Sequence, residues 1–420
     1  MVVSIARKNL LEDVPRFLVA QAGIMFAVAL VTLQTGIFNG FVNSTIQLTA
    51  NSNADIWVAS DTLVQLELSL PIPVAELIAT REVEGVEQAE GLIFSGAQWY
   101  PNNGEMSRVR LVGFDPNGEL FAPDGLVRGS VRDLSEPYTA IVDEADRDAL
   151  GVPDIGGEAQ VNSFATTVVG FTRGNTAMVS NAFTFVSLAS ANAYTTAGQQ
   201  SSISCELPTS GAVDLECTNT FTRDPLDNAR RDAPPAPSRL VASDLISYIL
   251  VRAEPGQDIA ALKQRLVESL PGTVAYTQQE IIDLTVDYWK QRTSIGFVLG
   301  MGAVVGIVVG VVVVSQILYS SVSDHLKEFG TLKAIGASSR QIYGIIIEQA
   351  LWMAVLGYLP SMAACLGVAQ WVGTSQGIEI AIAPLTAVGV FGLTIAMCIG
   401  SAIFAIQKVN HVDPALVFKA

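Results

Sequence analysis

Charged and reactive side chains are scarce in this sequence. Only 15% of the 420 residues are Asp, Glu, Lys or Arg, and the two histidines, His325 and His411, are far apart. Without a Cys/His cluster, a zinc site is not expected. The dipeptide Gly-Lys and the Gly-x-Ser-x-Gly motif are both missing, so we find no P-loop and no hydrolase nucleophile of that type. We therefore expect a non-enzymatic chain with no catalytic residue and no metal site.

Cysteine is also rare, with four residues in the chain. Cys365 and Cys398 lie in long apolar stretches, where a cysteine usually acts as a small buried apolar residue. Cys205 and Cys217 lie in a polar stretch, and in an oxidising compartment they could close a small loop as a disulfide. Two free thiols are the alternative.

Apolar residues are abundant, at 50% of the chain with a mean hydropathy of +0.41. This composition is typical of a membrane protein. A bilayer core of about 30 Å takes roughly 20 helical residues. Four stretches are long enough, and we predict that each is a transmembrane helix: Phe17–Phe41, Ile295–Tyr319, Ile342–Val372 and Pro384–Val409. A cleaved signal peptide explains the first stretch less well, because signal-peptide cores are usually about 7–15 residues long.

Positive residues flank these stretches unequally, which predicts their orientation. Only Lys290 and Arg292 lie beside them on one side of the membrane. Cytoplasmic flanks are rich in Lys and Arg, so we expect both termini in the cytoplasm and residues 43–292 outside it. The positive residues on the expected cytoplasmic side are Arg7, Lys8, Arg16, Lys327, Lys333, Arg340, Lys408 and Lys419.

Residues 43–292 are acidic, with a net charge of −17, whereas the rest of the chain carries +1. An acidic surface does not favour nucleic acid, because phosphate binding needs clustered cations. The run of four acids around Asp143–Asp148 fits either a cation site or a solvated helix start, and the second interpretation is simpler.

The outer region shows two β-α-β patterns that are far apart in sequence. Alternation predicts a strand at Asn53–Ser60, and Pro73–Tyr100 then gives a helix, a turn at Gly85 and a strand. Ile246–Leu284 repeats the pattern. We predict one α/β subdomain with halves at 43–105 and 240–287, interrupted by a β-rich insertion at 106–194 and a polar, flexible excursion at 195–239.

The predicted order of segments follows from these observations. It comprises a cytoplasmic interfacial helix at 1–16, the first span at 17–42, the outer α+β domain at 43–292, the second span at 293–320, a polar segment at 321–341, the third span at 342–372, a short outer loop at 373–383, the fourth span at 384–408 and a cytoplasmic tail at 409–420. The fold class is thus a four-helix membrane protein with a large extracytoplasmic α+β domain.

The second span has features at its outer end and along one face. Tyr288 and Trp289 suit the aromatic belt of a membrane interface, with core packing as the alternative. Gly302, Gly306 and Gly310 repeat every four residues and form a smooth face for helix packing, which could also serve between two copies of the chain. The ordinary enrichment of glycine in membrane helices is the other explanation.

The polar segment between the second and third spans predicts a short lever helix. Ser323 or Asp324 can cap its start and Gly336 can end it. Phe329, Leu332 and Ile335 would share a face that docks in a groove of a partner, or else lies flat on lipid. One ionisable residue of the third span, Glu348, is either a functional group within the membrane or a side chain that simply faces the headgroups or another helix.

This part of the sequence resembles a known family. Ser323–Gly357, "SDHLKEFGTLKAIGASSRQIYGIIIEQALWMAVLG", is similar to the permease domain of FtsX/MacB-type ABC transporters. Tyr288–Gly336 resembles the DevC-type branch more closely, and the similarity extends to "NADIWVAS", "GAQWY" and the "VDPALVF" of Val412–Phe418. The polar stretch Thr195–Arg239 is longer than the family pattern.

The resemblance implies a MacB-like (type VII ABC transporter) architecture in a bacterial inner membrane, with the large loop in the periplasm. It implies a homodimer of permeases that pairs with a separate ATPase subunit, which binds ATP and Mg, while this chain binds no cofactor. Further implied partners are a membrane fusion (adaptor) protein, a TolC-type outer-membrane channel and a lipid-like cargo. The residues that would meet the ATPase are Asp324, His325, Lys327, Glu328, Phe329, Thr331, Leu332, Lys333, Ile335 and Gly336.

The function expected from this resemblance is export by mechanotransmission, in which ATPase movement passes through stiff helices to the periplasmic domain. Polar residues are sparse in the four apolar stretches, which suits levers better than a hydrophilic pore. Two alternatives share the mechanism. One is an FtsX-like relay that activates a periplasmic cell-wall hydrolase, and the other is lipoprotein release of the LolC/LolE type.

Overall fold

The computed structural model describes residues 14–102, 105–176, 181–196, 201–206, 216–221, 236–292, 294–325, 328–329, 331–332, 335–376 and 380–410. The chain divides into two compact units. We call Phe41–Arg292 the sheet domain, and Met1–Gly40 with Thr293–Ala420 the helical unit. The predicted interfacial helix and tail fall mostly in residues 1–13 and 411–420, outside the described part.

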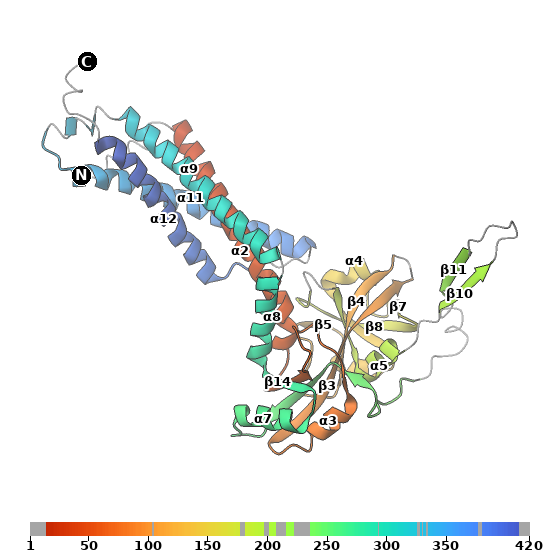
Figure 1. The fold of residues 1–420 in the computed structure, drawn as a ribbon. Coiled ribbons are helices and arrows are strands. Elements are labelled where there is room, and N and C mark those ends of the chain that lie inside the picture. The colour runs from red at the N-terminus through yellow and green to blue at the C-terminus, as the bar shows by residue number, and fades with distance from the viewer. Residues whose placement is uncertain are drawn as a thin grey trace. The chain divides into compact units, whose positions relative to one another are not determined.

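Long helices make up the helical unit (Figure 1). They are α2 (Val14–Ala50), whose last residues belong to the sheet domain, α9 (Ser294–Asp324), α11 (Ser339–Gln376) and α12 (Pro384–Asn410). Among the described residues, four helices are long and apolar enough to cross a membrane. Each is longer than the span predicted for it, because polar residues extend the helix beyond the apolar run.

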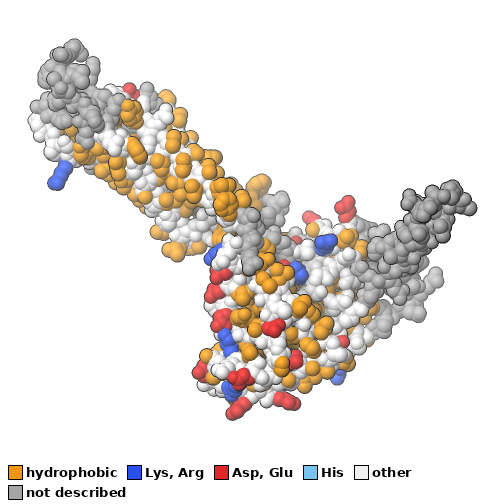
Figure 2. All heavy atoms as spheres, viewed as in Figure 1, with side chains coloured by type: hydrophobic (Ala, Val, Ile, Leu, Met, Phe, Trp, Pro, Cys, Tyr) orange, Lys and Arg blue, Asp and Glu red, His pale blue; other side chains and the backbone are white. Residues whose placement is uncertain are grey.

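Apolar side chains both fill the helical unit and cover it. Ile24 of α2, Leu318 of α9 and Ile346 of α11 are buried in its core. Others such as Phe297 and Val304 on α9 are exposed. Figure 2 shows hydrophobic side chains gathered over the long helices, whereas charged side chains lie on the sheet domain. Such a surface suits a lipid environment.

The first part of the sheet domain consists of two β-α-β units that lie far apart in the sequence. Strands β14, β1, β13 and β3 are neighbours in that order and pair antiparallel, the arrangement of a ferredoxin-like fold. Leu77 and Leu262 are buried in the domain core. The elements are β1 (Ile56–Ser60), α3 (Val74–Thr80), β3 (Val86–Pro101), β13 (Tyr248–Ala253), α7 (Ile259–Ser269) and β14 (Thr273–Thr277).

The insertion continues the same sheet through the long strand β3. Residues 86–92 of β3 pair with β13, and residues 93–99 pair with β4, so ten strands form one sheet. The strands of the insertion are β4 (Ser107–Phe114), β5 (Leu126–Arg128), β6 (Thr139–Asp143), β7 (Glu158–Val161), β8 (Phe164–Thr172) and β9 (Ala182–Ser187). Short elements are β2 (Ile72–Pro73), η1 (Val131–Ser135), η2 (Glu144–Asp146), α4 (Arg147–Leu150) and β12 (Leu245–Ile246).

Two stretches differ from the sequence-based expectation. The apolar run after β9 turns into α5 (Leu188–Thr196), where Ala191 packs onto Gly113 of β4 and Tyr194 is fully buried. The polar excursion contains an antiparallel pair, β10 (Ser201–Glu206) and β11 (Glu216–Phe221), with Cys205 and Cys217 at opposed positions of the register. Tertiary packing, which leaves little local pattern in the sequence, decides the first of these differences.

Candidate functional site: the corner between α9 and α11

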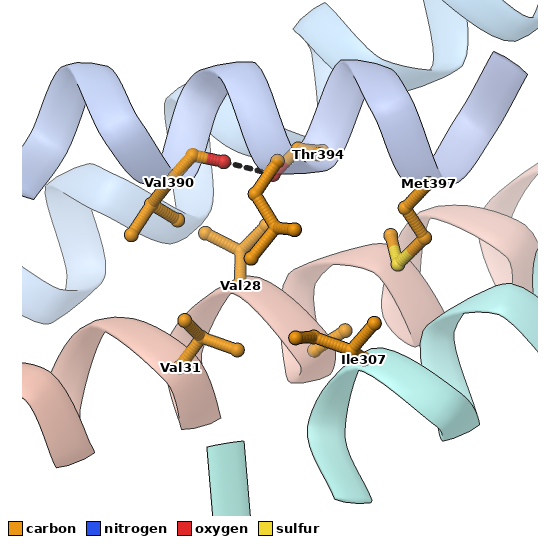
Figure 3. A pocket seen from close by; sticks show the side chains of 8 residues that line it. Val28, Val31, Ile307, Val390, Thr394 and Met397 are labelled. Carbon is orange, nitrogen blue, oxygen red and sulfur yellow. Dashed lines mark hydrogen bonds between the residues drawn. The ribbon is translucent and has the colours of Figure 1, made fainter. Parts of the chain in front are cut away.

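The described residues offer little for chemistry inside the protein. They contain no group of three or more His, Cys, Asp or Glu side chains placed to hold a metal. A cavity between α2, α9 and α12 is lined mainly by apolar side chains, and the hydroxyl of Thr394 there donates to Val390 O at 2.7 Å (Figure 3). Its volume is about 10 Å³. A single water needs about 10–15 Å³, so the bundle is closed to a hydrated solute at this point.

The backbone continues α9 into the polar segment beyond it. His325 N–H donates to Ser321 O at 3.2 Å, and Phe329 N–H donates to His325 O at 3.0 Å. Both bonds have the four-residue spacing of an α-helix. Lys327 and Lys333, which were predicted to take part in coupling, lie outside the described residues. We call residues 324–341 the corner.

Gly336 and Ser338 make the turn of the corner tight. Gly336 has a φ of 102°, a conformation that favours glycine, and Ala337 N–H donates to Leu332 O at 2.9 Å. This six-to-one bond is a Schellman-type helix end. Two residues after Gly336, Ser338 N–H donates to Oε1 of Gln341 at 2.9 Å, which is half of a capping box for α11. One helix therefore stops and the next starts within two residues.

The apolar residues of the corner do not share one exposed face, contrary to the sequence-based prediction. Phe329 is only 3% exposed and belongs to the core of the helical unit, with Leu332 packed against that core. Ile335 is 79% exposed. Positions i, i+3 and i+6 span about 120° of a helix circumference, so the core can bury the first and leave the last outside. In this structure Phe329 therefore packs inside the chain, whereas the contact of Leu332 with a partner stays a prediction.

The outward side of the corner is mixed in character. Asp324, Thr331 and Gly336 are exposed, like Ile335. Nδ1 of His325 lies 3.2 Å from Oε1 of Glu328, whose side chain is 59% exposed. A segment that exposes both an apolar side chain and polar groups suits a contact with another protein.

The glycine face of α9 packs against helices of the same chain. A Cβ on Gly306 would lie 2.7 Å from Cδ2 of Leu30, and one on Gly310 would lie 2.8 Å from Cβ of Ala27. A Cβ on Gly302 would overlap the amide of Gln34. The face therefore packs against α2 and α12 of the same chain, as expected for helix packing, and a role between two copies stays a prediction. Gly23 and Gly357 make similar close contacts, which no sequence periodicity had indicated.

Trp289 packs against α2 rather than standing alone at a membrane surface. Its ring meets Phe41 edge-to-face, with centroids 5.1 Å apart, and Tyr288 packs edge-to-face on Trp289 at 5.8 Å. Both rings belong to α8 (Gln278–Arg292), the helix that precedes α9. Trp289 thus takes part in helix packing, and its place in an aromatic belt stays a prediction.

Comparisons with known proteins agree with this architecture. Long apolar helices together with a split α/β domain define a membrane protein with a large extramembrane domain. The family model of the MacB-like periplasmic core domain matches residues 17–269, and that of the FtsX-like permease C-terminal region matches residues 300–414. The chain belongs to the FtsX/MacB-like permease superfamily. That the chain belongs to the DevC-type branch of this superfamily stays a prediction.

Individual relatives are distant. Two curated proteins, both described as macrolide export ATP-binding/permease protein MacB, are 23% identical to this chain. The protein of Hyphomonas neptunium matches over 143 residues, 34% of this chain and 22% of its own length. That of Acinetobacter baylyi matches over 151 residues, 35% of this chain and 22% of its own length. The match thus spans about a fifth of each relative.

Solved structures of periplasmic and extracellular regions are also similar. The periplasmic region of MacB from Actinobacillus actinomycetemcomitans is 9% identical, with a TM-score of 0.33, and the match covers 57% of this chain and 95% of that one. The extracellular domain of the ABC-type transporter YknZ from Gram-positive bacteria is 10% identical, with a TM-score of 0.31, and the match covers 54% of this chain and 100% of that one.

Proposed function

We propose that this chain is the non-catalytic permease subunit of an ATP-driven ABC exporter. A separate ATPase, which binds the ATP and Mg, docks on the outward side of the corner, on the cytoplasmic face of the inner membrane. Its movement passes through the long helices to a periplasmic sheet domain. A second copy of the chain, an adaptor protein and a TolC-type outer-membrane channel complete the assembly, which exports a lipid-like or amphipathic cargo.

One observation carries this proposal: the corner exposes Ile335 while it anchors Phe329 in the helical core. A docked partner that pushes on Ile335 therefore pushes a segment that is already fastened to the spans. The tight turn at Gly336 and Ser338 passes that displacement on to α11. Membership in the superfamily supports the same mechanism. The small cavity between α2, α9 and α12 agrees with it, because helices that only transmit movement need no water-filled path.

The proposal is tested by Ile335→Glu in the full chain purified with its partner ATPase. A charge on this exposed apolar residue would lose most of the co-purifying ATPase, at least about tenfold, because a hot-spot side chain contributes 2 kcal/mol or more to binding. The unfolding midpoint of the permease would not change, since Ile335 packs on nothing in the core.

Val241→Glu is the matched control, because Val241 is an exposed apolar residue of the sheet domain. It should leave ATPase association intact. An Ile335→Glu variant that still binds the ATPase with wild-type affinity would exclude the corner as the docking site.

A further inference from the structure

The covalent chain passes between the two units at two places. One is between Gly40 and Phe41, inside α2, and the other is between Arg292 and Thr293, after α8. Displacement of the helical unit that travels along the chain therefore reaches the sheet domain through α2 and α8. Whether these two helices move together or separately depends on the contacts between them inside the sheet domain.

Among the described residues, contacts of two kinds join α2 and α8 within the sheet domain. The first is the edge-to-face pair of Phe41, which is 2% exposed, and Trp289. The second involves Gln278, the first residue of α8, whose Nε2 donates to Thr49 O at 2.7 Å and to Ser52 O at 3.1 Å. Phe41 and Thr49 are eight residues apart, about 12 Å along a helix. The helices are thus fastened at two separated points.

The contact of Gln278 is chemically specific. The last carbonyl groups of an α-helix have no partner within the helix and carry a partial negative charge. Gln278 donates to Thr49 O in the last turn of α2, which also accepts from Ser52 N–H, and to Ser52 O two residues beyond the helix end, so it holds the end of α2 from another helix. A glutamate of the same shape could not donate when ionised, and it would face the negative end of α2.

The capped turn is also fastened to the centre of the sheet. Ser52 Oγ donates to Leu120 O at 3.0 Å, and Asn53 N–H donates to the same carbonyl at 2.8 Å. The neighbouring Glu119 N–H donates to Oε1 of Glu90 on β3 at 2.8 Å. Strand β3 is shared by the ferredoxin-like layer and the insertion, so the end of α2 is tied to the strand that joins both parts.

We infer that Gln278 is a positioning residue that locks the ends of α2 and α8 together, so that the two helices displace the sheet domain as one body. The lock itself is independent of the proposed exporter function; only its use for ATP-driven movement rests on that proposal.

The test is hydrogen–deuterium exchange of the full chain in lipid nanodiscs, without any ATPase. The informative amides are those of Asn51, Ser52 and Asn53, which are hydrogen-bonded in the wild type. We expect Gln278→Ala to speed their exchange several-fold and Gln278→Glu by about tenfold or more at pH 7.5, equivalent to losing at least one net hydrogen bond. Exchange in β13 and β3 should stay unchanged.

Two further measurements separate a specific lock from mere space filling. Gln279→Glu is the control, since Gln279 is exposed and its side chain donates to Oδ1 of Asp283 on its own helix at 2.9 Å. In Gln278→Glu, lowering the pH below about 4 should partly restore protection, after correction for intrinsic rates, because a neutral carboxyl regains one donor. A space-filling residue would instead tolerate glutamate, which has the same shape, and would show no such pH dependence.

The inference is overturned if Gln278→Glu exchanges like the wild type, or if exchange rises equally throughout the sheet domain. Its failure can be distinguished from failure of the proposed function. ATPase docking is measured by Ile335→Glu at the corner, whereas the lock is measured without the ATPase. If the Gln278 variants exchange as predicted but the chain binds no ATPase, this inference is supported and the proposed exporter function is excluded.

Discussion

The helical unit and the sheet domain bury polar groups in different ways. In the helical unit, hydroxyls donate to helix carbonyls, as Ser361 does to Met25 O at 2.9 Å and Ser401 to Val311 O at 3.1 Å. The sheet domain buries carboxylates as well as hydroxyls. Asp143 is 1% exposed and accepts from Asn175 N–H at 2.8 Å, and burial raises its pKa.

The difference shows what each unit is sensitive to. In the helical unit, helices approach closely where glycines lack a side chain, so a larger residue at such a position is the change that disrupts the packing. In the sheet domain, buried carboxyl groups link folding to protonation. Three predictions would break or sharpen this contrast.

The largest effect is expected from Gly310→Leu in the helical unit. Its Cβ alone would lie 2.8 Å from Cβ of Ala27 and would overlap Met397, so the helices must separate. We expect a loss of about 3 kcal/mol in the free energy of unfolding, at the upper end of the cost of overpacking. Thermal unfolding in detergent measures it.

Gly300→Leu is the matched control on the same helix. No atom lies within 4 Å of a Cβ built there, and the position is exposed. This variant should unfold at the wild-type temperature. Equal effects at Gly310 and Gly300 would show that glycine acts through backbone freedom rather than through close packing.

A smaller, pH-dependent effect is expected from Asp146→Asn in the sheet domain. Burial, with a smaller contribution from the charge of Asp143, raises the pKa of Asp146 to about 6, and its Oδ2 is buried without a hydrogen-bond partner among the described residues. A carboxyl group whose pKa is higher in the folded than in the unfolded state stabilises the native state while the pH is below the pKa that the group has in the unfolded chain. That contribution is lost as the pH rises through about 4 to 6.

Asp146→Asn should therefore raise the stability of the sheet domain by about 2 kcal/mol at pH 7.5, from a shift worth 1.36 kcal/mol per unit and reduced because water reaches part of the side chain. It should have little effect at pH 4. Asp148→Asn, at an exposed position of the same segment, serves as control. Denaturant unfolding at both pH values measures the stabilities. A gain in stability that is the same at pH 4 and pH 7.5 would contradict the raised pKa of Asp146.

The smallest effect on the fold is expected for the cysteine pair. Directly opposed residues of an antiparallel pair have Cα atoms about 4.5–5.5 Å apart, within the usual range for a disulfide. We predict that Cys205 and Cys217, opposed in β10 and β11, form a disulfide. Mass spectrometry after alkylation with and without reduction measures this, with the free, buried Cys365 and Cys398 as internal standards. Alkylation of both residues without reduction would show free thiols.

Local patterns in the sequence predicted much of the fold. The four long helices follow from long apolar runs, and β1, α3, β13 and α7 from their periodicity. The boundaries were less accurate, since α2 continues to Ala50 and α9 to Asp324. At the corner, the spacing of Phe329, Leu332 and Ile335 predicted an apolar side but not which residue the core would take. Ser338 and Gln341 carried a readable helix-start signal that had been overlooked.

Composition, periodicity and motifs predict the apolar helices, the split of the α/β layer and the resemblance to the permease superfamily. Only the folded structure shows which helices fill the glycine face of α9, that Phe329 points inward, and that Gln278 binds Thr49 O in the last turn of α2 and Ser52 O just beyond it, 229 and 226 residues away. Contacts across such separations leave no periodic trace, since they depend on how already formed elements meet in space.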